Sequence, residues 1–145
     1  MMLPLSRAPL FVLLLAAAAL LPRTAALADT LYDDLGGDAR VSQFVGEMLA
    51  IAVKDPRIAK DFDNINIDWL HNRIVLQICA LTGGPCKYTG RDMHAAHKGL
   101  HLATLDFNAL VEDLQIAMDR ADVPFWTQNR LLAILAPMYH DIVTR

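Results

Sequence analysis

The sequence predicts a small all-α domain, and three observations support this. Apolar residues recur with the spacing i, i+3, i+4, i+7 in four separate segments of the chain. Glycine and proline clusters separate these segments, and none of them alternates apolar and polar residues as a half-buried strand does. The chain has 145 residues and shows no internal repeat or linker, so one domain is expected.

Residues 1–28 predict a secretory signal peptide. Arg7 precedes an apolar run of 12 residues, Leu10 to Leu21, and the segment closes with the small-x-small pattern Ala26-Leu27-Ala28. The run is shorter than the roughly 20 residues that a membrane span needs, although an uncleaved anchor is the alternative. We therefore expect a domain over residues 29–145 that is secreted, most simply to the periplasm.

The charge balance limits the partners. Without Arg7 and Arg23 the chain has 11 basic and 16 acidic residues, a net charge near −5. Such a domain is not expected to bind nucleic acid or, in its mature form, an anionic membrane surface.

The first two predicted helices follow from caps and breaks. Asp38 is a candidate N-cap of a helix that ends around Asp55-Pro56, and a second helix begins near Asn66 or Asp68. Gly83-Gly84-Pro85 ends that second helix. The expected inward positions are Val41, Phe44, Val45, Met48, Leu49, Ala52 and Val53 in the first helix, and Ile67, Leu70, Ile74, Ile78 and Leu81 in the second.

Two more helices complete the domain. Thr104 is a candidate cap of the third helix, and Pro124 suits the first turn of a fourth helix that runs to about Val143. Pro137 should bend this last helix. The expected inward positions are Phe107, Leu110, Val111, Leu114 and Met118 in the third helix, and Leu131, Leu135, Met138 and Ile142 in the fourth.

The only two cysteines, Cys79 and Cys86, lie seven positions apart. An exported chain meets an oxidising environment, so we predict a disulfide that ties the end of the second helix to the following loop. In the loop-entropy account so short a ring contributes about 2–3 kcal/mol. Two free thiols are the alternative.

The segment Gly83–His101 contains the candidate metal-binding residues. It holds His94, His97 and His101 within eight residues, after the Gly-Gly-Pro break. A short helix behind such a loop can present a neutral imidazole to a metal ion. Alternatively, all three histidines could bind zinc from one helical face, but Gly99 interrupts that helix and no further cysteine or carboxylate is obviously in range.

Three motifs match one family. The first is Leu31-Tyr32-Asp33-Asp34-Leu35-Gly36-Gly37, and the second is Gly83-Gly84-Pro85 followed by Tyr88-x-Gly90-x-x-Met93-x-x-x-His97. The third is Leu135-Ala136-Pro137 in the last helix. In these motifs the chain, from about Leu31 to Val143, resembles the truncated haemoglobins and most of all their first group. The resemblance implies a truncated globin-like two-over-two helical sandwich that binds haem b.

The resemblance assigns the proximal side of the haem. His97 matches the proximal ligand of the haem iron, with a surface histidine as the alternative. Phe62 matches an aromatic residue that wedges against the haem ring, and Met93 would pack against the macrocycle or the neighbouring helix.

The resemblance also indicates the mouth of the pocket. Tyr88 matches a loop tyrosine that approaches a haem propionate. Arg73 and Lys87 are the cations expected to pair with the propionates, unless they are solvated surface charges.

The distal side departs from the family pattern. Many group 1 members place a tyrosine and a glutamine there, whereas the matching positions in this chain are Leu49, Leu70 and Ile74. Loss of one hydrogen bond costs about 1–3 kcal/mol, which would speed dioxygen release about 10- to 100-fold. Gln77 could reach inward, and His71 could serve as a distal contact or sixth iron ligand. Each could instead be a boundary or surface residue.

Three functions remain open at this point. The first is a haem-b globin that reversibly binds a diatomic gas, oxygen, nitric oxide or carbon monoxide, in the periplasm. The second is a haem enzyme for nitric oxide detoxification or weak peroxidase activity, which the apolar distal side disfavours. The third is a non-haem helical metal-binding or structural domain. The sequence names no electron donor.

Overall fold

The computed structural model describes residues 29–145, and within this part the chain forms helices and no strands, which confirms the all-α prediction. The predicted signal peptide, residues 1–28, lies outside the described residues. No helix in the described part is both long and apolar enough to cross a membrane. The elements are α1 Leu31–Asp34, α2 Gly37–Ala52, η1 Ala59–Phe62, α3 Ile67–Leu81, α4 Met93–His97, α5 Thr104–Arg120, α6 Phe125–Leu135, η2 Ala136–Met138 and α7 Tyr139–Ile142.

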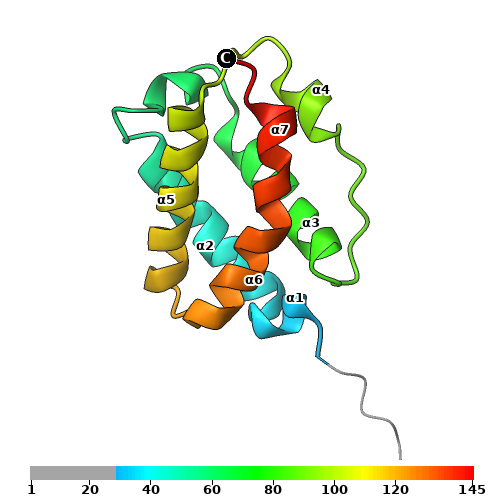
Figure 1. The fold of residues 1–145 in the computed structure, drawn as a ribbon. Coiled ribbons are helices and arrows are strands. Elements are labelled where there is room, and N and C mark those ends of the chain that lie inside the picture. Colours follow the sequence, from blue (N-terminus) through cyan, green and yellow to red (C-terminus); the bar gives the residue numbers. More distant parts are fainter. Residues whose placement is uncertain (1–28) are drawn as a thin grey trace, which may run out of the picture.

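The long helices form two layers around one core. Helix α2 packs extensively against both α3 and α5, and the run from α6 through η2 to α7 lies beside α5 in front of α2 and α3 (Figure 1). The short helix α4 packs against α7. The largest fully buried side chains include Leu35, Phe44, Leu49, Met118 and Leu131, so the core lies where α1, α2, α5 and α6 meet.

A glycine pair joins α1 to α2. Thr30 caps α1, because its hydroxyl accepts the Asp33 N–H and the Asp33 carboxylate accepts the Thr30 N–H in return. Gly36 and Gly37 have φ angles of +90° and +64°, which side chains disfavour. Gly36, not Asp38, is the N-cap of α2, so that prediction was wrong. Asp38 lies instead in the first turn, where a negative charge favours the helix dipole.

Helix α3 begins as predicted but turns a different face to the core. Asn66 is its N-cap and accepts the Trp69 N–H at 2.9 Å. Val75, Ile78 and Cys79 are buried, whereas Leu81 is 40% exposed, so Leu81 was wrongly assigned to the inward stripe. The other predicted inward positions, Ile67, Leu70 and Ile74, are half-buried.

The last two long helices are close to their predicted bounds. The N-cap of α5 is Ala103 rather than Thr104, and the Asp106 carboxylate accepts the Ala103 N–H at 2.8 Å. The Thr104 hydroxyl lies 2.7 Å from that of Tyr139, which ties the start of α5 to α7. The fourth predicted helix is divided at Pro137, where the 3-10 helix η2 separates α6 from α7.

One buried carboxylate in α5 has no partner. Asp113 is 1% exposed, and its Oδ2 atom makes no hydrogen bond. Burial raises the pKa of Asp113, and the nearby carboxylate of Asp55 raises it further, while Arg57 lowers it. The pKa of Asp113 is higher in the folded than in the unfolded state. As pH rises from the unfolded pKa through the folded pKa, the charged carboxylate therefore increasingly destabilises the fold.

We therefore expect Asp113→Asn to increase the free energy of unfolding at pH 7.5 by about 1–3 kcal/mol, the usual cost of an unpaired buried polar group. The gain should be smaller at pH 4, because the raised pKa of Asp113 lets more of the wild-type carboxyl groups take up a proton as pH falls. Urea denaturation at both pH values measures this. Asp55→Asn is the control with the opposite sign, because Arg57 lowers the pKa of Asp55 and the variant loses that ion pair. An equal gain at both pH values would contradict the argument.

Candidate functional site

Helices α3 and α4 are packed on different partners. The extensive contacts of α3 are with α2, whereas those of α4 are with α7. Phe62, Leu70 and Ile74 pack against the core and are nonetheless only half-buried. Leu49 of α2 is 1% exposed. The predicted site is therefore an apolar surface that is partly exposed on one side and packs against the protein core on the other.

His97 is held in one tautomer on α4. Its Nδ1 atom lies 2.8 Å from the Met93 carbonyl oxygen, and the side chain is half-buried. A carbonyl oxygen only accepts, so Nδ1 carries a proton, and in the neutral imidazole Nε2 is then the nitrogen with the lone pair. A hydrogen bond to the second ring nitrogen is the usual way in which proteins orient a metal-ligating histidine.

The start of α4 is fixed by a side-chain cap. Asp92 precedes the helix, and its Oδ1 atom accepts the Ala95 N–H at 2.7 Å. The carbonyl oxygen of the same residue accepts the Ala96 N–H at 2.9 Å. These two bonds orient a helix of only five residues, and with it His97.

The other histidines do not join His97. His94 and His101 are exposed, and His101 lies beyond the end of α4 with a φ angle of +53°. In the described part of the chain no three side chains of histidine, cysteine, aspartate or glutamate come together as a metal site. The zinc alternative was therefore wrong, because α4 ends at His97 before a third ligand can follow.

His71 and Gln77 point to different neighbours. The Nε2 atom of His71 lies 2.9 Å from the Ser42 carbonyl oxygen, so this side chain ties α3 to α2. That contact contradicts the alternative in which His71 reaches the distal side as a sixth ligand. The Gln77 amide lies 3.3 Å from the Met93 sulfur and thus spans the space between α3 and α4.

The loop from α3 to α4 is closely tied at its start. Cys79 and Cys86 form the predicted disulfide, with Cα atoms 5.7 Å apart. A Cβ atom on Gly84 would lie 2.6 Å from the Cys79 sulfur and 2.8 Å from the Tyr32 ring, so the loop backbone is pressed against both. The Tyr32 N–H donates to the Thr82 carbonyl oxygen at 3.0 Å and fastens the same corner to α1.

Tyr88 and the two predicted cations differ in exposure, because Tyr88 and Arg73 are half-buried whereas Lys87 is exposed. The Tyr88 hydroxyl donates to the Arg91 carbonyl oxygen at 3.0 Å, so it orders the loop. The Arg73 guanidinium lies 5.6 Å from the centre of the Trp69 ring, in a cation–π contact. Lys87 is exposed.

A carboxyl group beside Phe62 is partly buried. The Asp61 Oδ2 atom has no hydrogen-bond partner. Burial raises the pKa of Asp61, and the nearby carboxylate of Asp106 adds to the rise. This carboxyl group therefore keeps its proton to a higher pH than an exposed aspartate.

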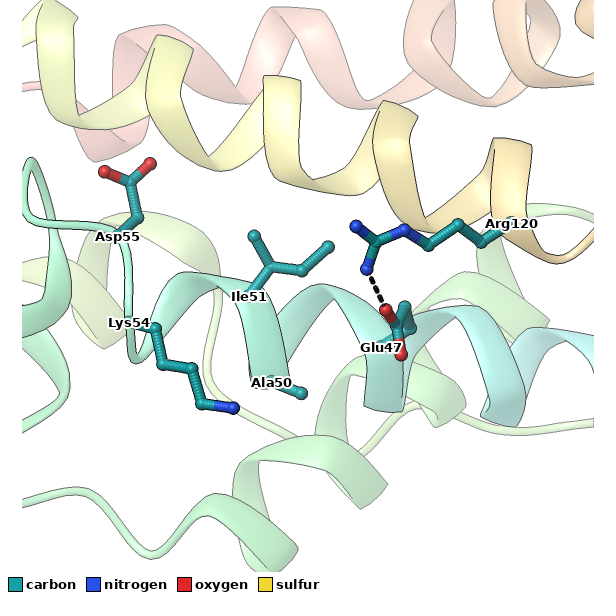
Figure 2. Close-up of a pocket in the computed structure, with 6 residues that line it drawn as sticks. All are labelled: Glu47, Ala50, Ile51, Lys54, Asp55 and Arg120. Carbon is teal, nitrogen blue, oxygen red and sulfur yellow. Dashed lines mark hydrogen bonds and ion pairs between the residues drawn. The ribbon is translucent and has the colours of Figure 1, made fainter.

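A separate groove of about 460 Å³ lies between α2 and α5 (Figure 2). Arg120 of α5 reaches across it to form an ion pair with Glu47 of α2. The lining residues are Glu47, Ala50, Ile51, Lys54, Asp55 and Arg120. None of them is a predicted site residue, and none is a histidine or cysteine that could bind iron.

Sequence reasoning missed three residues that shape the site. Asp92 caps α4, and its position before Met93-x-x-x-His97 in an N-cap pattern could have revealed it. Trp69 supports Arg73 from the i, i+4 position of the same helix, which helical spacing also predicts. The contact of Ser42 with His71 joins residues 29 apart, and no local pattern announces it.

Comparisons with known proteins identify the family. The sequence profile of the bacterial-like globins matches residues 30–144. The group 1 truncated haemoglobin of Tetrahymena pyriformis is 31% identical over 114 residues, which are 79% of this chain and 94% of that protein. That of Mycolicibacterium paratuberculosis is 28% identical over 115 residues, 79% of this chain and 85% of that protein.

A solved structure agrees. The truncated haemoglobin of Tetrahymena pyriformis in its Fe(III) form superposes with a TM-score of 0.77 at 26% identity, over 81% of this chain and 100% of that one. The chain therefore belongs to the bacterial-like globin family and is homologous to the group 1 truncated haemoglobins.

Haem is accordingly the cofactor, and the residues of this structure fit it. A single histidine with a free Nε2 atom suits an axial ligand of haem iron better than a site built from several protein ligands. The half-buried apolar side chains of Phe62, Leu70 and Ile74 suit a flat apolar ring. The fit thus rests on both the donor and the surface beside it.

Proposed function

We propose that this protein is a periplasmic haem-b globin that reversibly binds a diatomic gas, with His97 as the proximal ligand. The observation that carries the proposal is the half-buried His97 imidazole, whose Nδ1 donates to the Met93 carbonyl and whose Nε2 is free. When bound, haem supplies an iron atom with an open position for the gas.

Different residues would bind the iron and the ring of the haem. His97 would ligate the iron, and the Met93 carbonyl would orient the imidazole by accepting the Nδ1 proton. Half-buried apolar side chains would contact the haem ring, because removing their apolar surface from water stabilises the complex. These side chains are Phe62, Leu70, Ile74 and Met93.

The two predicted cations would act at the edge of the site. Arg73 and Lys87 would pair with the propionates, and charge-assisted pairs of this kind are among the stronger hydrogen bonds. Trp69 already restricts the Arg73 side chain.

The ultraviolet–visible spectrum of the purified mature protein tests the proposal. It should be recorded with haem, in the ferric and reduced states, with and without carbon monoxide. We expect a Soret band, a five-coordinate reduced form and a shift with carbon monoxide. A protein that binds no haem would refute the proposal, and a six-coordinate reduced form would contradict its open distal side.

The apolar distal positions favour reversible binding over oxygen chemistry. Leu49, Leu70 and Ile74 offer no hydrogen-bond donor, and Gln77 is engaged with the Met93 sulfur. A donor that holds dioxygen would assist nitric oxide dioxygenation, and these positions provide none. No residue of the described site specifically favours an enzyme.

Leu49→Tyr is therefore expected to slow dioxygen release by about 10- to 100-fold, the equivalent of a hydrogen bond of about 1–3 kcal/mol. Leu49→Phe is the matched control, because it adds the ring without the hydroxyl in the same buried position. Stopped-flow displacement of dioxygen by carbon monoxide measures both variants. Equal rates for the tyrosine and phenylalanine variants would mean that residue 49 does not face the ligand.

The disulfide supports export. Structural disulfides persist in oxidising compartments and are rare in the cytosol. Expression of the full chain followed by intact-mass analysis of the periplasmic fraction tests this point. We expect a protein that begins at about Asp29, and full-length protein confined to the cytoplasm would refute the location.

A further inference from the structure

A nearly continuous set of contacts connects the disulfide to His97. Cys79 is fully buried in the core, so it provides a fixed point at the end of α3. Its bond to Cys86 fixes the loop two residues before Tyr88. Gly84 lies inside this small ring and is pressed against the sulfur and the Tyr32 ring. The start of the loop therefore has little freedom to shift.

The second half of the loop continues the connection. Tyr88 packs over Gly90, where a Cβ atom would lie 2.2 Å from the Tyr88 hydroxyl oxygen, and the hydroxyl donates to the Arg91 carbonyl. Asp92 follows directly and caps α4. The Met93 carbonyl then accepts the proton of His97 Nδ1. Each contact spans only a few residues, so a displacement of Cys86 would be transmitted to the imidazole.

We propose that the Cys79–Cys86 disulfide is the positioning element of the proximal ligand, so that the protein retains haem tightly only when the disulfide is formed. The inference rests on His97 being the iron ligand, as proposed above. Helix α4 lacks extensive contacts with α3 beyond the Gln77–Met93 contact, so the loop and α7 are its main supports. Without the disulfide, the loop is no longer fixed at its start.

The redox step is an ordinary thiol–disulfide exchange. A dithiol reductant attacks one sulfur, the Cys79–Cys86 bond breaks, and both cysteines become thiols. The reductant supplies the two electrons and two protons and closes into its own disulfide. After export, exchange with an oxidised dithiol, which accepts the two electrons and two protons and is itself reduced to two thiols, re-forms the Cys79–Cys86 bond. The compartment in which the chain is oxidised would therefore also be the one in which it retains haem.

The test measures haem loss from the whole protein to an excess of apomyoglobin. We expect Cys86→Ser and the dithiothreitol-treated wild type to lose haem about 10- to 100-fold faster than the oxidised wild type, the usual effect of losing an outer-shell support. The iron–histidine stretching band of the reduced protein should also shift or broaden, because the imidazole is held less firmly. Cys86 is chosen because it is half-buried, whereas Cys79 lies in the core.

A matched variant separates positioning from general destabilisation. Leu131→Ala removes a fully buried side chain from α6 and leaves the disulfide intact. It should keep the wild-type iron–histidine band, even if it unfolds as readily as Cys86→Ser. Haem loss from Cys86→Ser within twofold of the oxidised wild type would overturn the proposal, as would the same band shift in Leu131→Ala.

The outcome also distinguishes this proposal from the one on which it rests. If His97→Ala retains haem with the wild-type spectrum, the ligand assignment fails. If His97→Ala loses haem while Cys86→Ser behaves as wild type, only the role of the disulfide fails.

Discussion

Replacing His97 with alanine is expected to abolish stable haem incorporation, which is the largest effect of any single substitution in this chain. The variant removes the only side chain in α4 that combines partial burial with a free imidazole nitrogen. Loss of an outer-shell partner alone typically costs about 10–100-fold in metal affinity, so loss of the ligand should cost more. The ratio of Soret to protein absorbance after reconstitution measures the result.

His94→Ala is the matched control for this substitution. His94 lies three positions earlier on the same short helix and is exposed. We expect it to bind haem like the wild type. Added imidazole should restore the Soret band of His97→Gly, because a free imidazole can occupy the space of the missing side chain. Equal haem binding by the two alanine variants would contradict the assignment.

Gly84→Ala is expected to destabilise the fold markedly. The added Cβ atom would meet the Cys79 sulfur at 2.6 Å and the Tyr32 ring at 2.8 Å. Neither neighbour can easily move, because the sulfur belongs to a disulfide and Tyr32 is 7% exposed. Overpacking of this kind costs about 1–3 kcal/mol, and we expect a loss of that size in the free energy of unfolding.

Gly46→Ala is the control with the opposite sign. Gly46 lies inside α2, and its added Cβ atom would meet the His71 ring at 3.7 Å, an ordinary contact. Alanine stabilises a helix interior by about 0.5–1 kcal/mol relative to glycine. Urea denaturation of both variants at one pH provides the comparison. A Gly84→Ala protein as stable as the wild type would mean that the loop is not pressed against the disulfide.

The helical architecture could be predicted because its determinants are local. The i, i+3, i+4 pattern placed four long helices, and Asn66 and Pro137 marked a start and a bend within one turn of their observed places. The cap of α2 was misplaced because Asp38 satisfies the local rule, whereas the positive φ angles of Gly36 and Gly37 start the helix earlier. Asp38 and the Gly36-Gly37 pair are both possible helix starts, and the helix begins at the glycine pair because its positive φ angles favour glycine.

The burial of Asp113 could not be predicted from its surroundings in sequence. Glu112 precedes it directly, and a carboxylate in such a helix normally marks the solvent face. Asp113 is nevertheless 1% exposed, and Asp55 and Arg57, which lie near it in the fold, are more than fifty positions away in the sequence. The same holds for the orientation of His71, which Ser42 determines from another helix.

The disulfide could be predicted, because Cys79 and Cys86 are near neighbours in the sequence and the chain is expected to be exported. The roles of His97 and Met93 follow from the resemblance and stay predictions, although the contact between the two residues is local. The direction of Gln77 depends on how α3 faces α4, so sequence left it open and the contact with Met93 resolved it.

The contacts that order the segment from Cys79 to His97 join residues that are mostly near neighbours in that same segment. Its internal geometry is therefore largely insulated from the rest of the sequence. None of these contacts involves a side chain of α2, so substitutions on α2 can remodel the other side of the proposed pocket without removing a contact that presents the imidazole. Under the proposed assignment of His97, the distal residues could then be exchanged to alter gas binding while the same imidazole still holds the iron.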